Sequence, residues 1–340
     1  MSVQREELPD SAFRFLSAAQ LSAEPELPPA AGTLLDAWRR LRKNRVAVFS
    51  ALVLLVLILL AALAPVLAPY PPNEQHLPYR NLPPRLPGVS VNGLNGYRLF
   101  RGRWTDAYAK ANVPDDVHFL FGTDEFGRDL FSRTLYGTRI SLIIAFMAAL
   151  LDLSIGIACG LFSAMKGGRV DTVLQRFLEI LSGTPSLVLV VMMLLVFEPG
   201  MTSIILAMVI SSWIPMARVV RAQTIKVKQM EYIQAAQALG ASGLQIALNH
   251  VLPNISGVVI VRAMFSIPSA IFFETFLSFI GVGMKIPDAS LGTLLNGGYK
   301  VFRLYQYQMF IPAVILCVIM LSFNLLADGL RDVFDPKMKE

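Results

Sequence analysis

Several apolar stretches longer than roughly 18 residues, the length that crosses a lipid bilayer as a helix, constrain this chain more than any other feature. They lie near residues 46–68, 141–165, 173–197, 201–220, 257–283 and 309–330. Charged residues make up only 16% of the 340 residues, against roughly 25% in soluble domains. The sequence therefore predicts an all-α polytopic membrane protein with six transmembrane helices.

The basic residues behind the net charge of +6 lie next to the apolar stretches. Lysine and arginine before residue 46, in 166–172, in 221–256 and in the tail 331–340 predict that these segments are cytoplasmic, because positive charge favours that side. The linker 198–200 carries neither residue and is expected outside the cell. Six crossings then leave both termini in the cytoplasm. This distribution of charge disfavours nucleic-acid binding.

Two segments flank the first span. Residues 1–45 are expected to form a cytoplasmic tail, and its part 33–45 forms either an amphipathic helix on lipid headgroups or an ordinary basic run beside the membrane. Thr33 and Asp36 fit the capping pattern that starts a helix. Residues 69–137, rich in proline, glycine and aromatic residues, predict a long extracytoplasmic loop whose turn signals suit a small β-rich cap.

A cleaved signal peptide is the alternative for residues 46–68. It is disfavoured because the segment before these residues is long and because Pro65 directly follows the candidate cleavage site. We therefore expect a retained first span, followed by a core of five further helices within residues 138–330.

Charged side chains within the spans are candidates for function. Asp152, Arg262 and Glu274 lie in apolar stretches, where a charge costs roughly 2.5–3.5 kcal/mol at a helix centre. Such groups face the bundle interior, a partner subunit or water, so each can line a translocation path or join two helices. We take Glu274, Asp152 and Phe273 as candidates for the path. Prolines that can kink a helix stand at Pro185, Pro215, Pro268 and Pro312.

The segment 231–254, EYIQAAQALGASGLQIALNHVLPN, is too polar to span a membrane and begins with good helix formers. Gly240 can end a first helix with a left-handed cap, Ser242 can begin a second, and Pro253 is expected to end it. The small side chains of Ala235 and Ala236 would let another protein surface approach closely. We therefore predict a compact helix–turn–helix, called the elbow below, within the cytoplasmic segment 221–256.

The elbow resembles the cytoplasmic coupling loop of ABC importer permeases, E-A-A-x3-G-x9-I-x-L-P. Two positions differ from that motif, since Gln234 replaces its glutamate and His250 its isoleucine. Glutamine retains hydrogen-bonding capacity but loses the charge. The resemblance assigns coupling to a partner ATPase to these residues: Glu231, Gln234, Ala235, Ala236, Gly240, His250, Leu252 and Pro253.

Three further stretches, 121–142, 274–298 and 322–336, are similar to the C-type transmembrane subunit of the oligopeptide and dipeptide permease family. This resemblance implies the type I fold of ABC importer permeases. The first stretch supplies an extracytoplasmic signature that either contacts peptide or packs the loop through local salt bridges. Its residues are Gly122, Thr123, Asp124, Gly127, Arg128 and Asp129.

The resemblance implies a permease subunit of an ATP-driven importer of oligopeptides or dipeptides in a bacterial cell membrane. The same machinery with another cargo (a nickel chelate, glutathione or a sugar) is an alternative, as is an ion-driven carrier. The implied partners are a homologous second permease subunit, two ATPase subunits that bind ATP and Mg, an extracytoplasmic peptide-binding protein and membrane lipid.

The sequence lacks a G-x4-G-K-[ST] phosphate loop and the hydrolase motifs H-E-x-x-H and G-x-S-x-G. We therefore expect that this chain itself is not an enzyme and binds no cofactor. Two cysteines and three histidines form no ligand pattern, so no metal site is expected either.

Overall fold

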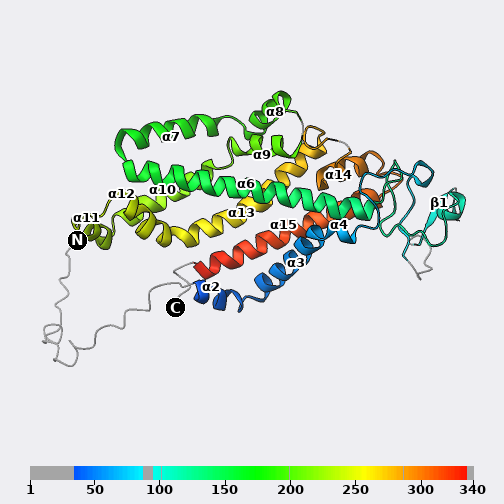
Figure 1. Cartoon of the computed structure of the whole chain (residues 1–340), viewed down its shortest axis with the longest axis horizontal. Helices are drawn as coiled ribbons and strands as arrows, with labels where there is room; N and C mark the ends of the chain where they lie inside the picture. The colour runs from blue at the N-terminus through cyan, green and yellow to red at the C-terminus, as the bar shows by residue number, and fades with distance from the viewer. Residues whose placement is uncertain (1–33, 87–94, 101, 199, 286, 335–340) are drawn as a thin grey trace, which may run out of the picture.

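The computed structural model describes residues 34–86, 95–100, 102–198, 200–285 and 287–334 as an elongated bundle of helices (Figure 1). By length and composition, four helical segments can cross a membrane: α3 (Arg45–Ala62), α6 (Leu130–Lys166), Gly243–Phe279 and α15 (Tyr307–Phe334). The third of these ends in α13 (Leu252–Phe279). Two bent helix pairs raise the number of crossings to six when each pair counts as one span. The predicted all-helical membrane class is confirmed.

Both bent pairs break beside a proline. Helices α7 (Gly168–Gly183) and α8 (Ser186–Val196) meet at 81°, and Pro185 is the residue that caps α8. Helices α9 (Met201–Val209) and α10 (Ile214–Lys228) meet at 40°, with Pro215 in the first turn of α10. Proline lacks the backbone donor that would continue the preceding helix. Pro268 and Pro312, by contrast, lie inside helices that remain continuous.

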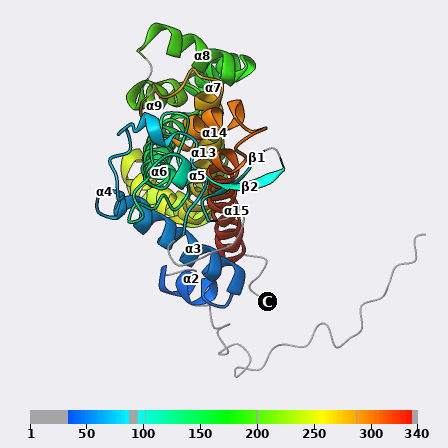
Figure 2. The same cartoon turned by 90° about the vertical axis from the view of Figure 1, so that its right-hand side faces the viewer.

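Helix α6 lies at the centre of the bundle, where it packs against both α10 and α13. Figure 2 shows α7 and α8 on one side of this centre and α2 (Leu34–Leu41) and α3 on the other. Helix α15 packs against α3 and α13, and Ile144, Ile271 and Leu277 are fully buried between the central helices. The outward side chains of α3 are apolar and exposed, as expected of a surface that faces lipid.

Two glycines bring α6 and α10 into close contact. Gly156 and Gly160 form a G-x-x-x-G pattern on α6, directly opposite Met216, Ala217 and Val220 of α10. Small residues at this spacing let helix backbones approach in a membrane. The sequence analysis did not use this pattern, although the spacing is visible in the sequence.

The segment between α4 (Ala64–Leu67) and α6 forms a small cap at one end of the bundle (Figure 1). It contains η2 (Leu77–Tyr79), the antiparallel strands β1 (Tyr97–Phe100) and β2 (Arg103–Asp106), and α5 (Ala107–Lys110). Leu82, Tyr108, Val113 and Phe119 form its own apolar core. Two strands of four residues each are the only named strands among its described residues, less β structure than the β-rich cap that the turn signals suggested.

One boundary and one helix differ from expectation. Helix α6 begins at Leu130, inside the segment 69–137 that we expected to be loop, because Asp129 caps its first turn. A further helix, α14 (Leu291–Lys300), lies between α13 and α15 and was not expected. Helix α2 does form in the basic segment before the first span, but Thr33, the expected cap, lies outside the described residues.

Candidate functional site

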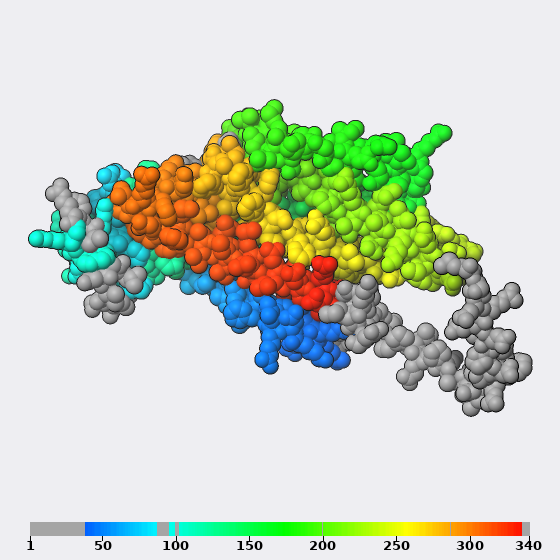
Figure 3. All heavy atoms as spheres, turned by 180° about the vertical axis from the view of Figure 1, so that it is seen from behind, coloured from blue at the N-terminus to red at the C-terminus, as the bar shows by residue number. Residues whose placement is uncertain are grey.

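The elbow forms at the opposite end of the bundle from the cap (Figures 1 and 3). Helix α11 (Glu231–Ala238) ends at Gly240, whose φ of +89° is the left-handed conformation expected there. Ser242 then starts α12 (Gly243–Gln245) in a capping box with Gln245. The helix–turn–helix expected from the sequence is therefore present, with both of its turn residues in the anticipated roles.

The expectation that Pro253 ends the second helix was wrong. Helix α12 continues through a π-helical turn, η3 (Ile246–Val251), directly into α13, so the helix is unbroken from Gly243 to Phe279. Pro253 lies in the first turn of α13. The wider π turn before it removes the need for a backbone donor at this position, which is how a helix can tolerate proline there.

Apolar contacts anchor the elbow to the bundle. Ile233 of α11 and Ile246 and Val251 of η3 are almost fully buried against Val220 of α10 and Leu161 of α6. The Lys228 ammonium also donates to the carbonyl of Ala164 at 2.9 Å, which joins the ends of α10 and α6. The elbow is therefore positioned by the helices that enter the membrane.

The outer surface of the elbow remains uncovered in this chain. Leu239 and Leu244 are 89% and 70% exposed, unusually high values for leucines in a folded segment. Among the predicted coupling residues, Glu231, Gln234, Ala235, Gly240 and Pro253 are exposed, while Ala236, His250 and Leu252 are half-buried. The Gln234 amide donates only to the backbone carbonyl of Gln229, at 3.3 Å.

An ion pair that was not predicted joins α10 to α7. Arg221 of α10 donates from Nε and Nη2 to the two carboxylate oxygens of Asp171 on α7, at 2.6 and 2.5 Å. Ser163 of α6 donates to the same carboxylate. A bidentate arginine–carboxylate pair fixes orientation as well as distance. Three helices are thus joined by one group, in which Arg221 lies 50 residues from Asp171 in the sequence.

A cavity of about 420 Å³ lies where the two broken spans bend. Asp152 of α6, Arg262 and Phe273 of α13, and Arg218 of α10 line it, together with several serines. Ser212, in the break between α9 and α10, donates a hydrogen bond to Asp152. Two of the three candidates for the translocation path, Asp152 and Phe273, therefore meet at one cavity.

Glu274, the third candidate, does not line this cavity. Its side chain is fully buried and accepts hydrogen bonds from Ser141 of α6 at 2.8 Å and from Ser278 of α13 at 2.9 Å. The backbone amide of Leu291 in α14 donates in turn to Ser141 at 3.2 Å. Of the two roles left open for this carboxyl group, its surroundings correspond to an interhelical contact.

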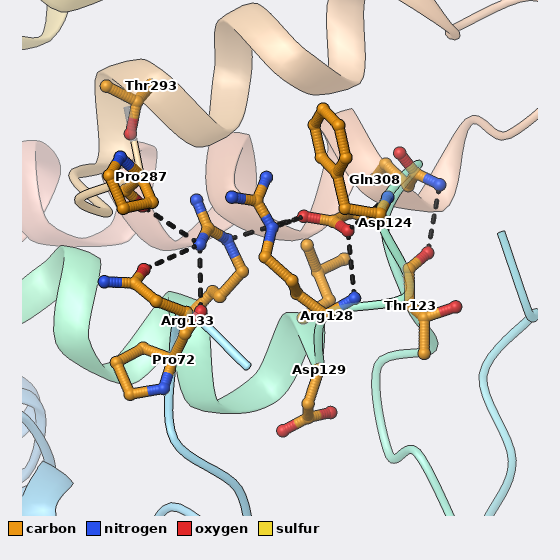
Figure 4. A network of polar contacts seen from close by, with 12 residues as sticks. Pro72, Thr123, Asp124, Arg128, Asp129, Arg133, Pro287, Thr293 and Gln308 are labelled. Carbon is orange, nitrogen blue, oxygen red and sulfur yellow. Dashed lines mark hydrogen bonds and ion pairs between the residues drawn. The ribbon is translucent and has the colours of Figure 1, made fainter. Parts of the chain in front are cut away.

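The residues of the extracytoplasmic signature pack against one another (Figure 4). Asp124 accepts a hydrogen bond from Arg128 Nε at 2.7 Å, and Arg133 Nε lies 3.6 Å from the same carboxylate. Arg133 Nη1 also donates to the carbonyls of Pro72 and Pro287, at 2.9 and 3.2 Å. Arg133 was not among the predicted residues, yet it joins the cap to α6 and to the loop before α14.

The other signature residues shape the same junction. The Thr123 carbonyl accepts from Gln308 of α15 at 3.0 Å. Gly122 and Gly127 both have positive φ, and a Cβ at Gly127 would lie 1.9 Å from the carbonyl oxygen of His76, so only glycine fits. These contacts join the cap to the bundle.

Asp129 differs in one detail from the expected local salt bridges, because it makes no ion pair within the described residues. It caps α6 instead, accepting from the amide of Ser132 at 2.8 Å and from its hydroxyl at 2.6 Å. Burial raises the pKa of this carboxyl above its ordinary value, and the hydrogen bonds from Ser132 and Phe131 oppose that shift.

Two functional regions thus share one helical bundle: an anchored elbow with an uncovered surface, and a polar cavity at the breaks of two spans. No group of three or more His, Cys, Asp and Glu side chains among the described residues could hold a metal ion. The class that these features define is a membrane-spanning transport subunit whose helices break around a polar cavity.

Comparison with known proteins gives the family. A model described as the binding-protein-dependent transport system inner membrane component matches residues 156–340, and one described as the N-terminal TM domain of oligopeptide transport permease C matches residues 33–84. The dipeptide transport system permease protein DppC of Lactococcus lactis is 41% identical over 94% of this chain and 95% of its own length.

Similar values hold for two Bacillus subtilis proteins. The dipeptide permease protein DppC is 36% identical over 99% of this chain and 96% of its own length. The oligopeptide permease protein OppC is 35% identical over 98% of this chain and 99% of its own length. The chain belongs to this family of binding-protein-dependent permeases, in its DppC and OppC group.

A solved structure shows the same fold. A chain of the inward-facing MetNI methionine ABC transporter aligns with a TM-score of 0.51 at 18% identity, over 61% of this chain and 98% of that one. The type I permease fold expected from the sequence is confirmed by this likeness together with the family.

Proposed function

We propose that this chain is one of two homologous channel-forming subunits of an ATP-driven importer that carries dipeptides or oligopeptides into a bacterial cell. ATP and Mg bind to two separate ATPase subunits, and one of these docks on the elbow. An extracytoplasmic binding protein delivers the peptide. The permeases named for dipeptide and oligopeptide transport that resemble this chain along nearly its whole length support the choice of cargo.

The exposure of the elbow is the observation that carries the proposal. A rigidly anchored helix pair that presents Leu239 and Leu244 to its surroundings has the form of a surface that another protein covers. The small side chain of Ala235 and the bare backbone at Gly240 allow that protein to approach closely. Gln234 offers a hydrogen-bond donor and acceptor to the partner without a charge.

The anchoring supplies a mechanism for coupling. Movement of the elbow is passed to α13 because the helix is continuous, and to α10 through the buried contacts of Ile233. Arg221 and Asp171 carry it on to α7. ATP-driven closure of the ATPase pair would thereby stabilise one of two packings of the spans, outward-open over inward-open.

The proposal also fixes the orientation in the membrane. With the elbow in the cytoplasm, the cap at the other end of the bundle is extracytoplasmic and meets the binding protein. Helix α2 and the C-terminal end of α15 lie together at the end of the α3 and α15 pair that is nearer the elbow (Figure 1), which supports cytoplasmic termini. The basic residues of α2 and of the segment after it, such as Arg39 and Arg42, would then face anionic lipid.

The test compares two alanine-to-arginine substitutions at opposite ends of the molecule. Ala235→Arg places a large charged group on the exposed elbow, whereas Ala109→Arg places the same group on the exposed helix α5 of the cap. Each variant is expressed with the other importer subunits. Co-purification of the ATPase subunits and uptake of a labelled dipeptide are then measured.

We expect Ala235→Arg to lose both the co-purifying ATPase and the uptake, because the arginine would have to be desolvated in the interface. Ala109→Arg should retain the ATPase subunits. Normal uptake by a well-expressed Ala235→Arg variant would contradict docking at the elbow. Failure of the unmodified complex to take up any peptide would contradict the assigned cargo.

A further inference from the structure

The cavity at the two broken spans is built from irregular backbone. Residues 184–185 separate α7 from α8, and residues 210–213 separate α9 from α10, and members of both breaks line the cavity. Backbone that is not helical is tolerated at membrane depth only where protein covers it or where it borders a polar cavity. Breaks of this kind accompany binding sites in other transport proteins. The cavity volume of about 420 Å³ falls within the range of roughly 300–1,000 Å³ found for small-ligand sites.

Three charged side chains line this cavity: Arg218 donates to Ser182 at 2.7 Å, and Asp152 and Arg262 form no ion pair with each other. The Arg262 guanidinium makes no hydrogen bond and no ion pair within the described part of the chain. Asp152 accepts a hydrogen bond from Ser212 through Oδ1, and Oδ2 receives no donor from any described residue. A charged side chain within a span is costly in free energy unless it has a partner. Asp152 Oδ2 and the Arg262 guanidinium can therefore each accept a polar group of a bound ligand.

We propose that the cavity is a transit site for short peptides with free ends, in which Asp152 binds the terminal ammonium and Arg262 binds the terminal carboxylate. This inference rests on the proposed function, because it assigns the recognition of that cargo to particular residues. An ammonium presents three donors and suits the open oxygen of Asp152, while a carboxylate suits the planar fork of a guanidinium.

The surroundings of the two charges match the parts that all peptides share. The termini are charged in every unmodified peptide, and two fixed opposite charges select for them without reading the sequence between. Apart from Arg218, which donates to Ser182, the remaining lining is hydroxyl-bearing or apolar, with Ser266 and Ser269 beside Phe273 and Val190. These side chains can adapt to different residues because they offer both hydrogen bonds and apolar contact. A long peptide cannot place both ends in one cavity, so the site favours short ones.

The experiment measures which cargo each variant prefers. The complete importer, with its unmodified binding protein, takes up three radiolabelled forms of one dipeptide: free at both ends, N-acetylated, and C-amidated. The permease carries Asp152→Asn, Arg262→Gln or the control Arg176→Gln. Arg176 is exposed on α7 and is paired with Glu179 away from the cavity. Because the binding protein is the same throughout, any change in the ratio between cargoes reports on the permease.

We expect Asp152→Asn to reduce the preference for a free amino end at least about tenfold, the scale of one lost charged hydrogen bond, while uptake of the N-acetylated form is unchanged. Arg262→Gln should reduce the preference for a free carboxyl end in the same way, and Arg176→Gln should alter neither ratio. An equal loss of uptake for all three cargoes would overturn the proposal, since it indicates a structural role.

A variant in which Asp152 and Arg262 exchange their charges distinguishes recognition of the peptide ends from an ion pair that only closes a gate. If Asp152 and Arg262 only form an ion pair with each other in another conformation, the double variant Asp152→Arg with Arg262→Asp would restore uptake with unchanged ratios, and this result also overturns the proposal. Under our proposal the double variant does not recover the preference for free ends, because the exchanged charges would require the peptide to enter in the opposite orientation to that in which it is delivered. If the wild-type importer takes up none of the three cargoes, the proposed function fails rather than this site alone.

Discussion

Replacing Gly160 by alanine should force α6 and α10 apart, because a Cβ at this position would lie 2.6 Å from the carbonyl oxygen of Ala217 and 2.8 Å from Cβ of Val220. Ordinary contacts of this kind begin near 3.4 Å, and the first of these neighbours is backbone, which cannot rotate out of the way. Interiors are packed too densely to absorb such a change locally.

The loss in free energy of unfolding caused by Gly160→Ala can be estimated by comparison with a second glycine. Overpacking a closely packed interface costs about 1–3 kcal/mol, while exchanging glycine for alanine inside a helix gains about 1 kcal/mol. Gly297 lies within α14 and has no atom within 4 Å of the position where a Cβ would be, so Gly297→Ala receives the gain without the clash. The free energies of unfolding of the two variants should therefore differ by about 1–3 kcal/mol.

The measurement is unfolding of the purified permease in mixed micelles with increasing fraction of a denaturing detergent, followed by tryptophan fluorescence. Gly156→Ala serves as a second test, since its Cβ would lie 2.6 Å from Cβ of Met216. Because both sites lie on one interface, the double variant should lose less than the sum of the two single losses. Equal stability of Gly160→Ala and Gly297→Ala would refute the close contact between these helices.

Three further predictions concern buried polar contacts. Glu274→Leu should reduce stability by about 1–3 kcal/mol, measured by the same unfolding assay, because it leaves the buried hydroxyls of Ser141 and Ser278 without their shared acceptor. Asp171→Asn should lower peptide uptake more than ATP hydrolysis, since it weakens the bidentate contact with Arg221; parallel loss of both activities would argue against a role in coupling. Arg133→Gln should make the cap more sensitive to limited proteolysis within residues 69–129, and an unchanged digestion pattern would show that this arginine does not hold the cap in place.

The sequence was most informative where the signal is local. Long apolar stretches predicted the crossings, and Gly240 and Ser242 predicted the turn of the elbow, because a left-handed cap and a helix start depend on neighbouring residues alone. The prediction that Pro253 ends the helix was wrong because it considered the proline alone. Its effect on a helix depends on the turn before it, and a π turn is not apparent from the residue types.

Contacts between distant segments could not be predicted from one sequence. Ser141 and Glu274 are 133 residues apart, and Asp171 and Arg221 are 50 residues apart, so nothing in either neighbourhood indicates the partner. For the same reason the analysis grouped Glu274 with Asp152, although the structure separates them. Helix α14 was missed because it is short and contains Gly297 and Gly298, which lower helix propensity.

The π turn between the elbow and α13 affects how the elbow is oriented around the axis of α13. A π turn holds one residue more than the α-helical turn it replaces, so it sets the angle at which everything before it is oriented around the helix axis. Removing a single residue from 246–251 would let the π turn become an α-helical turn with little change of orientation, whereas removing one from the α-helical residues 254–261 would rotate the elbow by about 100° relative to Arg262, while leaving both regions intact in themselves. The permease could then keep its cavity and its elbow and still present the elbow in the wrong direction, so that length, rather than chemistry, would decide whether an ATPase can engage it.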